Sequence, residues 1–407
     1  MVGSLDFMKK DRVMMQVYQE NLKIKEVGIA IIVKLSNVCN LSCSYCGVAG
    51  PLVRKIGWKL EVMNLNQISI LFDKIANSKR LTSVDFIWHG GEPLLMGLEF
   101  FKKIKDLEKK KLKNKGIIIK NSIQTNGTLI TDEWARFIKE NNFQIGVSID
   151  GPKELHNLQR KALVGDSYAQ VMHGIGILKK YKIPFGALAV VTHDTIKFGA
   201  KKLFKFFLRN KIYTFDFLPQ EPVFDENGKQ LTPDIYPSEE YVKFVNDLFD
   251  IWYNYDNPKI HILLFEEVLR TILGKGSKIC QIGHGICTGT TFTFYPDNTI
   301  RPCDKFPRAF GAVKGEEIAK INKINNFEDV FLLRSYKKLL LEQISSLSMC
   351  KNCKWYNKCK GACPFDRYMY KRNGLQNYKE CSTYKIYEHI YEKIKDQLAD
   401  INLKVVS

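Results

Sequence analysis

Short apolar runs alternate with helical patterns along the first two hundred residues. Six of these runs are apolar or β-branched and of strand length, which is typical of buried parallel strands. They are Gly28–Leu35, Ser83–Trp88, Ile117–Gln124, Gln144–Ile149, Pro184–Val191 and Tyr213–Leu218. Helical periodicity fills the intervals, at about 65–79, 97–113, 132–140, 167–181 and 196–209. This βα repeat predicts an α/β fold with a parallel sheet, open or closed, and six strands would make a partial (β/α)6 TIM-type barrel.

The pattern changes after about residue 219. Residues 219–237 are rich in Pro, Asp, Glu and Gly and predict a loop or lid, with helical stretches at about 238–254 and 261–274. A loop-rich segment with eight cysteines runs from there to about residue 384, before a final amphipathic helix. The predicted divisions are an N-terminal segment 1–25, a barrel core 26–220, a connection 221–274, a cysteine-rich domain 275–385 and a C-terminal helix 386–407.

Length and composition narrow the class of protein. A chain of 407 residues is too long for one ordinary core, and 45% hydrophobic residues exclude a disordered protein. No apolar run approaches the ~20 residues of a membrane span, and the N-terminus has no apolar signal-peptide core, so we expect a cytoplasmic protein without a membrane partner. In that reducing compartment the 11 cysteines favour metal ligation over disulfides.

The formal net charge of +19 suits an acidic peptide or a nucleic acid as partner. The densest basic stretch, Lys102–Lys115, holds eight lysines on the polar side of an amphipathic helical pattern. This pattern is typical of a solvated helix surface. Since a nucleic-acid partner would rest on charge alone, we do not expect one.

Residues suited to chemistry follow four successive strands, at the carboxyl ends where parallel βα folds gather function. These segments are Cys39-x3-Cys43-x2-Cys46, His89-Gly90-Gly91-Glu92-Pro93, Gln124-Thr125-Asn126-Gly127 and Ser148-Ile149-Asp150-Gly151. Three thiolates on one loop leave a metal position open for a substrate if no fourth ligand comes from the protein. The alternative is a zinc loop completed by a distant residue such as His89.

The Cys39, Cys43 and Cys46 motif, with Tyr45 before its last cysteine, resembles the signature of radical S-adenosylmethionine (SAM) enzymes. The resemblance implies a [4Fe–4S] cluster on the three thiolates, whose open iron binds SAM. It also implies reductive cleavage of SAM to a 5′-deoxyadenosyl radical, with a flavodoxin or ferredoxin as the external reductant. By position, the cofactor-binding residues would be Tyr45, Gly90, Gly91, Glu92, Pro93, Gln124, Asn126, Ser148, Asp150 and Arg160. Turn or cap roles are the alternative, because Asn126-Gly127 and Asp150-Gly151 are good turn pairs.

Eight further cysteines suffice for two complete four-cysteine sites, whether iron–sulfur clusters or zinc ribbons. They are Cys280, Cys287, Cys303, Cys350, Cys353, Cys359, Cys363 and Cys381. The run Cys359-x3-Cys363-Pro364 resembles a ferredoxin run, in which the last cysteine ligates the other cluster of a pair. This likeness favours iron–sulfur clusters with crossed ligation.

The arrangement also resembles the SPASM domain of radical SAM enzymes that mature peptides and proteins, over about residues 26–385, and is nearest to anaerobic sulfatase maturases. The resemblance implies two auxiliary [4Fe–4S] clusters, one on Cys280, Cys287, Cys303 and Cys363 and the other on Cys350, Cys353, Cys359 and Cys381. It also implies that Asp304, directly after Cys303, is the catalytic base. The simpler alternative is a turn aspartate paired with Lys305.

These features predict a maturase that oxidatively cross-links a ribosomally made precursor peptide, with an acidic leader as a further expectation. The bond would be a thioether, carbon–carbon or carbon–heteroatom link. One alternative is oxidation of Cys or Ser to formylglycine in a sulfatase, and another is a non-catalytic iron–sulfur or zinc module. Two departures from sulfatase maturases favour cross-linking: Gly47, where they usually carry an aromatic residue, and the x6 spacing from Cys280 to Cys287.

Overall fold

The fold is described from a computed structural model of the chain. The described residues are 27–51, 59–224, 229–232, 238–278, 282, 285, 287, 290–305, 317–375 and 377–406, with the backbone alone from 399 onward.

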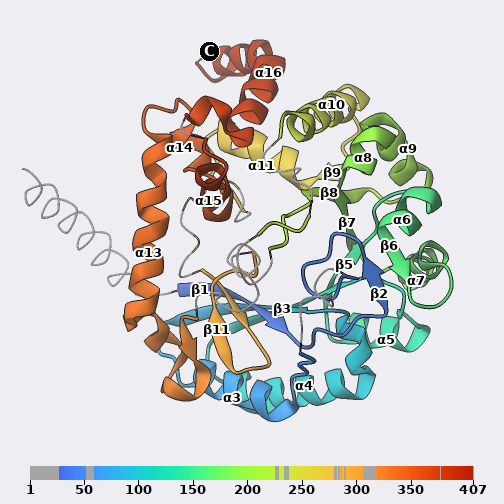
Figure 1. The fold of residues 1–407 in the computed structure, drawn as a ribbon, viewed down its shortest axis with the longest axis vertical. Coiled ribbons are helices and arrows are strands. Elements are labelled where there is room, and N and C mark those ends of the chain that lie inside the picture. Colours follow the sequence, from blue (N-terminus) through green and yellow to red (C-terminus); the bar gives the residue numbers. More distant parts are fainter. Residues whose placement is uncertain are drawn as a thin grey trace, which may run out of the picture.

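Six parallel strands form the centre of one curved sheet and lie side by side in chain order (Figure 1). They are β1 (Val27–Lys34), β3 (Leu81–His89), β4 (Ile118–Thr125), β5 (Gln144–Ser148), β7 (Phe185–Val191) and β8 (Thr214–Pro219). Their bounds agree with the predicted strands to within a few residues. The short β9 (His261–Ile262) pairs parallel with β8 at one edge.

Helices lie outside this sheet, along the rim of the view in Figure 1. In chain order they are α3 (Leu65–Ala76), α4 (Leu98–Leu112), α5 (Asp132–Glu140), α6 (Lys153–Gln159), α7 (Ser167–Lys180), α8 (His193–Phe198), α9 (Ala200–Arg209), α10 (Glu239–Tyr255) and α11 (Leu263–Ile272). The helix predicted at 196–209 is in fact two helices, because Gly199 adopts φ +96° between α8 and α9. Such a conformation is costly for other residues and breaks the helical hydrogen-bond pattern.

The sheet does not end where the barrel core was predicted to end. Strand β10 (Thr291–Phe294), from the cysteine-rich segment, pairs parallel with β1 on the side away from β3. The antiparallel β11 (Thr299–Arg301) and β12 (Ala319–Lys320) extend the sheet further. The cysteine-rich segment is therefore joined to the barrel by backbone hydrogen bonds.

The remaining elements are short, apart from two C-terminal helices. A separate small sheet pairs β2 (Leu41–Cys43) with β6 (Arg160–Ala162). The 3-10 helices are η1 (Pro93–Met96), η2 (Ile321–Lys323), η3 (Phe327–Leu332), η4 (Leu347–Cys350) and η5 (Tyr378–Glu380). The last α-helices are α13 (Arg334–Ser346), α14 (Tyr356–Cys359), α15 (Pro364–Arg372) and α16 (Ser382–Val406).

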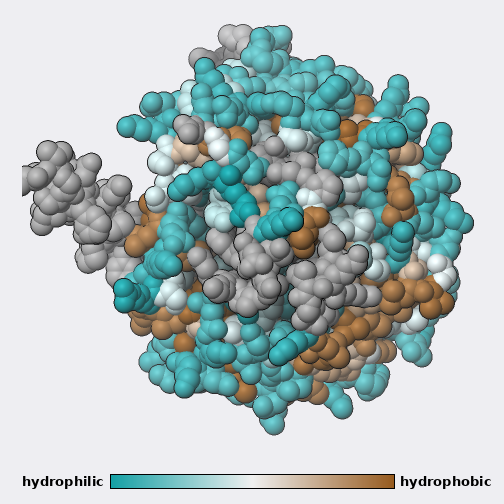
Figure 2. All heavy atoms as spheres, in the orientation of Figure 1, coloured by the Kyte–Doolittle hydropathy of each residue, from teal (hydrophilic) through white to brown (hydrophobic). Residues whose placement is uncertain are grey.

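The hydrophobic core lies between the sheet and its outer helices. Trp88, Phe72 and Phe101 are fully buried there. The Phe86 ring packs against Phe72 in a tilted contact and stacks on Trp88, and Trp88 meets Phe101 edge-on. The lysine-rich stretch lies largely in α4, which buries Phe101 and Ile104 and leaves most of its lysines exposed, as the pattern predicted. Figure 2 shows a mostly hydrophilic face with separate hydrophobic patches. Among the helices described here, none combines the length and the apolar character that crossing a membrane requires.

Candidate functional site

The loop after β1 carries the three cysteines Cys39, Cys43 and Cys46. Burial raises the pKa of Cys39 to about 11 and that of Cys43 further, and the neighbouring thiols add to both shifts. Backbone N–H groups point at the sulfurs, from Leu41 to Cys39 at 3.3 Å and from Ala49 to Cys46 at 3.3 Å. Thiols that resist ionisation alone but receive N–H donors suit a metal cluster, which deprotonates them and is tuned by such hydrogen bonds.

The glycine motif after β3 packs directly against the segment that leads into this loop. The N–H of Gly91 donates to the Ser36 carbonyl at 2.7 Å, and that of Glu92 donates to the Val38 carbonyl at 2.8 Å. A Cβ on Gly90 would lie 2.3 Å from the Ser36 oxygen, and one on Gly91 would lie 1.9 Å from the Val38 oxygen. We predicted that these glycines bind the cofactor. The structure gives them a further role, because the absence of a side chain lets them pack against the backbone of Ser36 and Val38.

Glu92 is fully buried and links this motif to the end of β4. Its Oε1 accepts hydrogen bonds from the Leu94 N–H at 3.0 Å and the Thr125 hydroxyl at 2.7 Å, and its Oε2 accepts one from the Asn126 N–H at 2.7 Å. Burial raises its pKa to about 7, against the lowering effect of these donors. A carboxylate has about four acceptor directions, so one remains for the predicted SAM ammonium group. Pro93 is buried at the start of η1.

Asn126 joins the β4 end to the cysteine loop. Its amide donates to Asn40 Oδ1 at 2.9 Å and lies 3.8 Å from Cys39 Sγ. Gln124, two residues earlier, donates instead to the Ser148 hydroxyl on β5 at 3.2 Å. Asn126 therefore contacts the predicted cluster site directly, whereas Gln124 and Ser148 form a polar pair on the neighbouring strands β4 and β5.

Asp150 holds Tyr45 and Arg160 in place. Its Oδ2 accepts from the Tyr45 hydroxyl at 2.7 Å and lies 2.9 Å from Arg160 Nε, while its Oδ1 accepts from the Val190 N–H at 3.0 Å. The Arg160 guanidinium stacks over the Tyr45 ring, and Arg160 pairs with Cys43 in the small β2–β6 sheet. These contacts support a positioning role for Asp150 beside the cysteine loop, and its contact with SAM stays a prediction.

Lys34 is the site residue that the sequence analysis missed. It ends the otherwise apolar β1, and its Nζ lies 2.6 Å from Asp304 Oδ2. The two side chains are only 7% and 15% exposed, so water screens the pair weakly. The alternative pairing of Asp304 with Lys305 is not found, because Lys305 lies 2.9 Å from Glu221. The sequence feature that could have indicated Lys34 is its single charge at the carboxyl end of an otherwise apolar strand.

His89 is the third member of this polar group. Its Nδ1 lies 3.0 Å from Lys34 Nζ and accepts a hydrogen bond from the Gly90 N–H at 2.7 Å. Because Nδ1 accepts the Gly90 N–H, the neutral ring carries its proton on Nε2, and a protonated Nε2 cannot bind a metal. This hydrogen bond therefore does not favour the zinc loop completed by His89. The group brings Asp304, from the cysteine-rich segment, to the same strand end as the glycine motif.

The auxiliary cysteines lie in two separate groups. Cys303 and Cys363 lie close to Cys287, within a small apolar cluster that includes Phe365, and burial raises the pKa of both well above its usual value. Cys280, the predicted fourth ligand of this group, lies outside the described residues. The structure thus brings Cys363 together with distant cysteines, as the crossed pattern predicted, although its role as a ligand stays a prediction.

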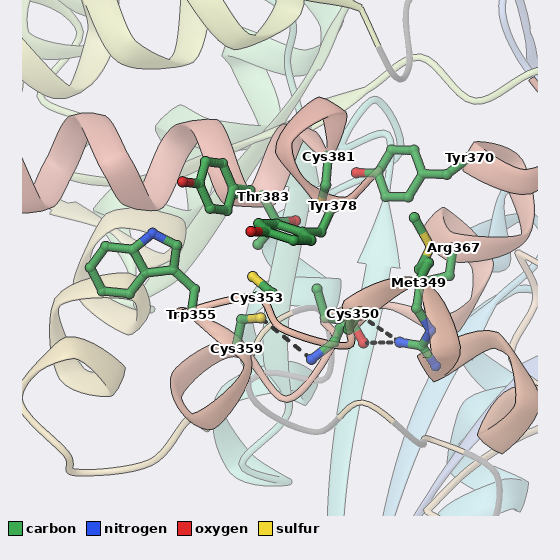
Figure 3. A pocket seen from close by; sticks show the side chains of 13 residues that line it. Met349, Cys350, Cys353, Trp355, Cys359, Arg367, Tyr370, Tyr378, Cys381 and Thr383 are labelled. Atoms are coloured by element: carbon green, nitrogen blue, oxygen red, sulfur yellow. Dashed lines mark hydrogen bonds between the residues drawn. The ribbon is translucent and has the colours of Figure 1, made fainter. Parts of the chain in front are cut away.

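The second group lines one pocket, shown in Figure 3 with its aromatic neighbours. Its four cysteines are Cys350, Cys353, Cys359 and Cys381. Burial raises the pKa of Cys350 to about 11 and that of Cys359 to about 12, and the other thiols of the group raise both. Within the described part of the chain, no three His, Cys, Asp or Glu side chains converge as they would on a single metal ion. In a four-iron cluster each thiolate binds a different iron, so its four cysteines lie further apart than the ligands of a single metal ion. The spacing of these four cysteines is consistent with such a cluster.

A curved parallel sheet with three cysteines on the loop after its first strand is typical of radical SAM enzymes. Residues 33–197 match the family model described as the Radical SAM superfamily. The chain is 32% identical over 387 residues to a cysteine-type anaerobic sulfatase-maturating enzyme of Clostridium perfringens, covering 90% of this chain and 97% of that relative. A serine-type enzyme of Bacteroides thetaiotaomicron is 30% identical, with 87% of each chain covered. The chain therefore belongs to the family of anaerobic sulfatase-maturating enzymes, which are radical SAM maturases.

Two solved structures resemble this fold. The structure of native anSMEcpe with bound AdoMet and Cp18Cys peptide is 29% identical, has a TM-score of 0.76, and is covered over 100% of its length by 93% of this chain. Streptococcus suis SuiB bound to S-adenosylmethionine has a TM-score of 0.60 at 16% identity, with 90% of this chain and 80% of that one covered. The second likeness concerns the fold alone.

Proposed function

We propose that this protein oxidises a Cys or Ser side chain of a sulfatase to formylglycine. The observation that carries the proposal is the match along nearly the whole chain to enzymes of that activity, at 30–32% identity. Cross-linking of a precursor peptide, which two sequence departures favoured, has less support. SuiB, one structure of which holds the precursor peptide SuiA, is only 16% identical to this chain.

Cys39, Cys43 and Cys46 would hold the cluster that binds SAM. The raised thiol pKa values and the N–H groups aimed at the sulfurs fit that role. Bound there, cluster and SAM would supply a 5′-deoxyadenosyl radical, with the first electron from an external flavodoxin or ferredoxin. Glu92 would use its remaining acceptor direction on the SAM ammonium, and Asp150 would hold Tyr45 and Arg160 around the cofactor.

Asp304 would be the catalytic base. A target cysteine loses a hydrogen atom from Cβ, a proton from sulfur and one electron, so that its thiol side chain becomes a thioaldehyde. Asp304 would take the proton. Clusters held by the auxiliary cysteines, among which Cys303 directly precedes Asp304, would supply an acceptor for the electron. Water then converts the thioaldehyde to the aldehyde with release of hydrogen sulfide, whereas a serine gives the aldehyde directly. Lys34 holds the carboxylate at the end of β1 throughout.

Anaerobic assay of the full chain tests this proposal. The protein, reconstituted with iron and sulfide, is mixed with SAM, dithionite and a Cys-x-Pro-x-Arg peptide or its serine counterpart. We expect 5′-deoxyadenosine together with the mass change of aldehyde formation in at least one peptide. Asp304→Asn should still release 5′-deoxyadenosine while aldehyde formation falls about 10²- to 10⁴-fold, the usual contribution of a general base.

The outcomes separate the alternatives. Release of 5′-deoxyadenosine with neither peptide changed would refute sulfatase maturation and restore peptide cross-linking as the better hypothesis. A protein that holds about twelve irons, as three four-iron clusters require, but releases no 5′-deoxyadenosine would refute the radical chemistry itself. Two or three zincs in place of iron would support the non-catalytic module.

A further inference from the structure

Arg367 is a buried cation that lies between the two auxiliary cysteine groups. It belongs to α15, which begins directly after Cys363, and its side chain is among the largest that are fully buried in the described part of the chain. It also lines the pocket of the second group (Figure 3). A guanidinium stays protonated under ordinary conditions, so this charge is a permanent feature of the interior.

Five hydrogen bonds fix the guanidinium to the loops that carry both groups. Its Nη1 donates to the carbonyls of Gly361 at 2.5 Å and Ala362 at 3.1 Å, in the turn between Cys359 and Cys363. Its Nη2 donates to the carbonyl of Gly285 at 2.5 Å, two residues before Cys287. The other two bonds reach the Gln343 carbonyl at 3.3 Å and the Ser346 hydroxyl at 2.9 Å.

The charge of Arg367 acts on thiols of both groups. A Cβ placed on Gly361 would lie 3.2 Å from Arg367 Nη1 and 3.6 Å from Cys350 Sγ, so both atoms face the same small space beside this glycine. Burial lowers the pKa of Arg367, whereas Cys350 of one group and Cys363 and Cys287 of the other raise it. The guanidinium therefore faces potential anions on two sides.

The hydrogen-bond partners of Arg367 do not neutralise its charge. All five acceptors are backbone carbonyls or a hydroxyl, and a buried cation without an anionic counterpart is costly. The neighbouring Asp366 supplies part of the compensation through space. Four thiolates around a [4Fe–4S]2+ core sum to a charge of −2, and one-electron reduction makes it −3. Two such sites would supply the remaining compensation.

We propose that Arg367 is a positioning residue and the shared counter-charge of both auxiliary clusters, which raises the reduction potential of the two together. The inference rests on the auxiliary clusters of the proposed function. A fixed positive charge favours the more negative, reduced form of each cluster, so it helps either one accept the electron released during substrate oxidation. Because one residue faces both groups, its removal should affect both potentials.

The test is an anaerobic redox titration followed by electron paramagnetic resonance, with iron content measured in parallel. Cys39, Cys43 and Cys46 are replaced by Ala, so that only the auxiliary clusters give signals. In this background Arg367→Gln and Arg367→Met remove the charge, and Arg367→Lys keeps it but cannot form the five-bond fork. Lys371→Gln is the matched control, because Lys371 lies on the same helix with its side chain exposed.

We expect the neutral variants to lower both potentials by at least about 59 mV, a tenfold change in a one-electron equilibrium. Arg367→Lys should stay nearer the parent protein, and Lys371→Gln should shift neither potential. If the neutral variants lose both clusters while Arg367→Lys retains them, the result would also support the proposal, because both clusters would then need the positive charge at this position in order to bind. Unchanged potentials, a shift in one cluster only, or equal iron loss in all three Arg367 variants would overturn the proposal.

This experiment is independent of sulfatase maturation. A parent protein without auxiliary signals would refute the cluster assignment within the proposed function. A parent protein with both clusters, whose potentials ignore Arg367, would refute this inference alone. Failure to oxidise the Cys or Ser peptide would leave the potentials measurable and therefore bears only on the proposed reaction.

Discussion

Replacing Lys34 with Met should uncouple radical formation from substrate oxidation. Lys34 Nζ lies 2.6 Å from Asp304 Oδ2, and both side chains are nearly buried. At that separation the attraction is about 6 kcal/mol at an effective dielectric constant of 20, before the cost of desolvation. Removing one partner of a buried pair typically lowers the free energy of unfolding by about 3–5 kcal/mol, because the other charge stays buried and unpaired. Asp304 would then leave its position at the end of β1.

The assay compares aldehyde formed with 5′-deoxyadenosine formed, in the same anaerobic reaction. Displacement of a catalytic group by about 1 Å can cost about 10²-fold in rate, so we expect the ratio of aldehyde to 5′-deoxyadenosine to fall by that order. Lys105→Met is the matched control, since it breaks the 2.5 Å ion pair with Glu108 on α4 and should leave the ratio unchanged. A Lys34→Met protein that retains its iron and shows the parent ratio would refute the positioning of Asp304 by Lys34.

Three further predictions concern the cofactor site and the second cysteine pocket. Gly91→Ala should lower the iron content by about four of twelve atoms, the iron of the predicted SAM-binding cluster, because the new Cβ would collide with the Val38 carbonyl. Iron analysis that shows all twelve atoms retained would contradict this. Cys359→Ser should lower the iron content by about four atoms while 5′-deoxyadenosine is still formed, and loss of SAM cleavage would argue against separate sites. Glu92→Gln should flatten the pH dependence of stability between pH 4.5 and about 7. In the parent protein the raised pKa of Glu92 means that its contribution to stability is greatest below this window and falls by about 3 kcal/mol as pH rises through it. Asp216, whose burial also raises its pKa to about 7, adds to this fall in both proteins. Denaturant titrations at several pH values should therefore give a smaller change of unfolding free energy with pH in the variant, and an identical change would contradict the prediction.

The barrel could be predicted from sequence because its strands carry a local signal. The runs around Ile31, Phe86 and Val147 are apolar over a strand's length, and a buried parallel strand needs little else. Strands β10 to β12 lack that signal, because they are two to four residues long and lie within a loop-rich segment. The partner of β10, strand β1, lies far away in sequence, so no local pattern could reveal that pairing.

The candidate site was predictable to the extent that motifs encode it. The likeness of Cys359-x3-Cys363 to a ferredoxin run indicated crossed grouping, and the structure places Cys363 beside Cys287 and Cys303. The pairing of Lys34 with Asp304 joins residues 270 positions apart, which only the folded sheet brings together. The packing of Gly91 against Val38 likewise depends on the register of β1 and β3.

The place of β10 in the sheet has a consequence for biosynthesis. The edge of β1 that faces away from β3 pairs with a strand that is synthesised about 260 residues later. At ordinary elongation rates this is a delay of roughly 13–50 s, during which the nascent chain exposes an unpaired apolar strand. The strand that leads into the cysteine loop therefore completes its sheet pairing only after β10 has been made, and we expect iron insertion into the first site to follow that pairing.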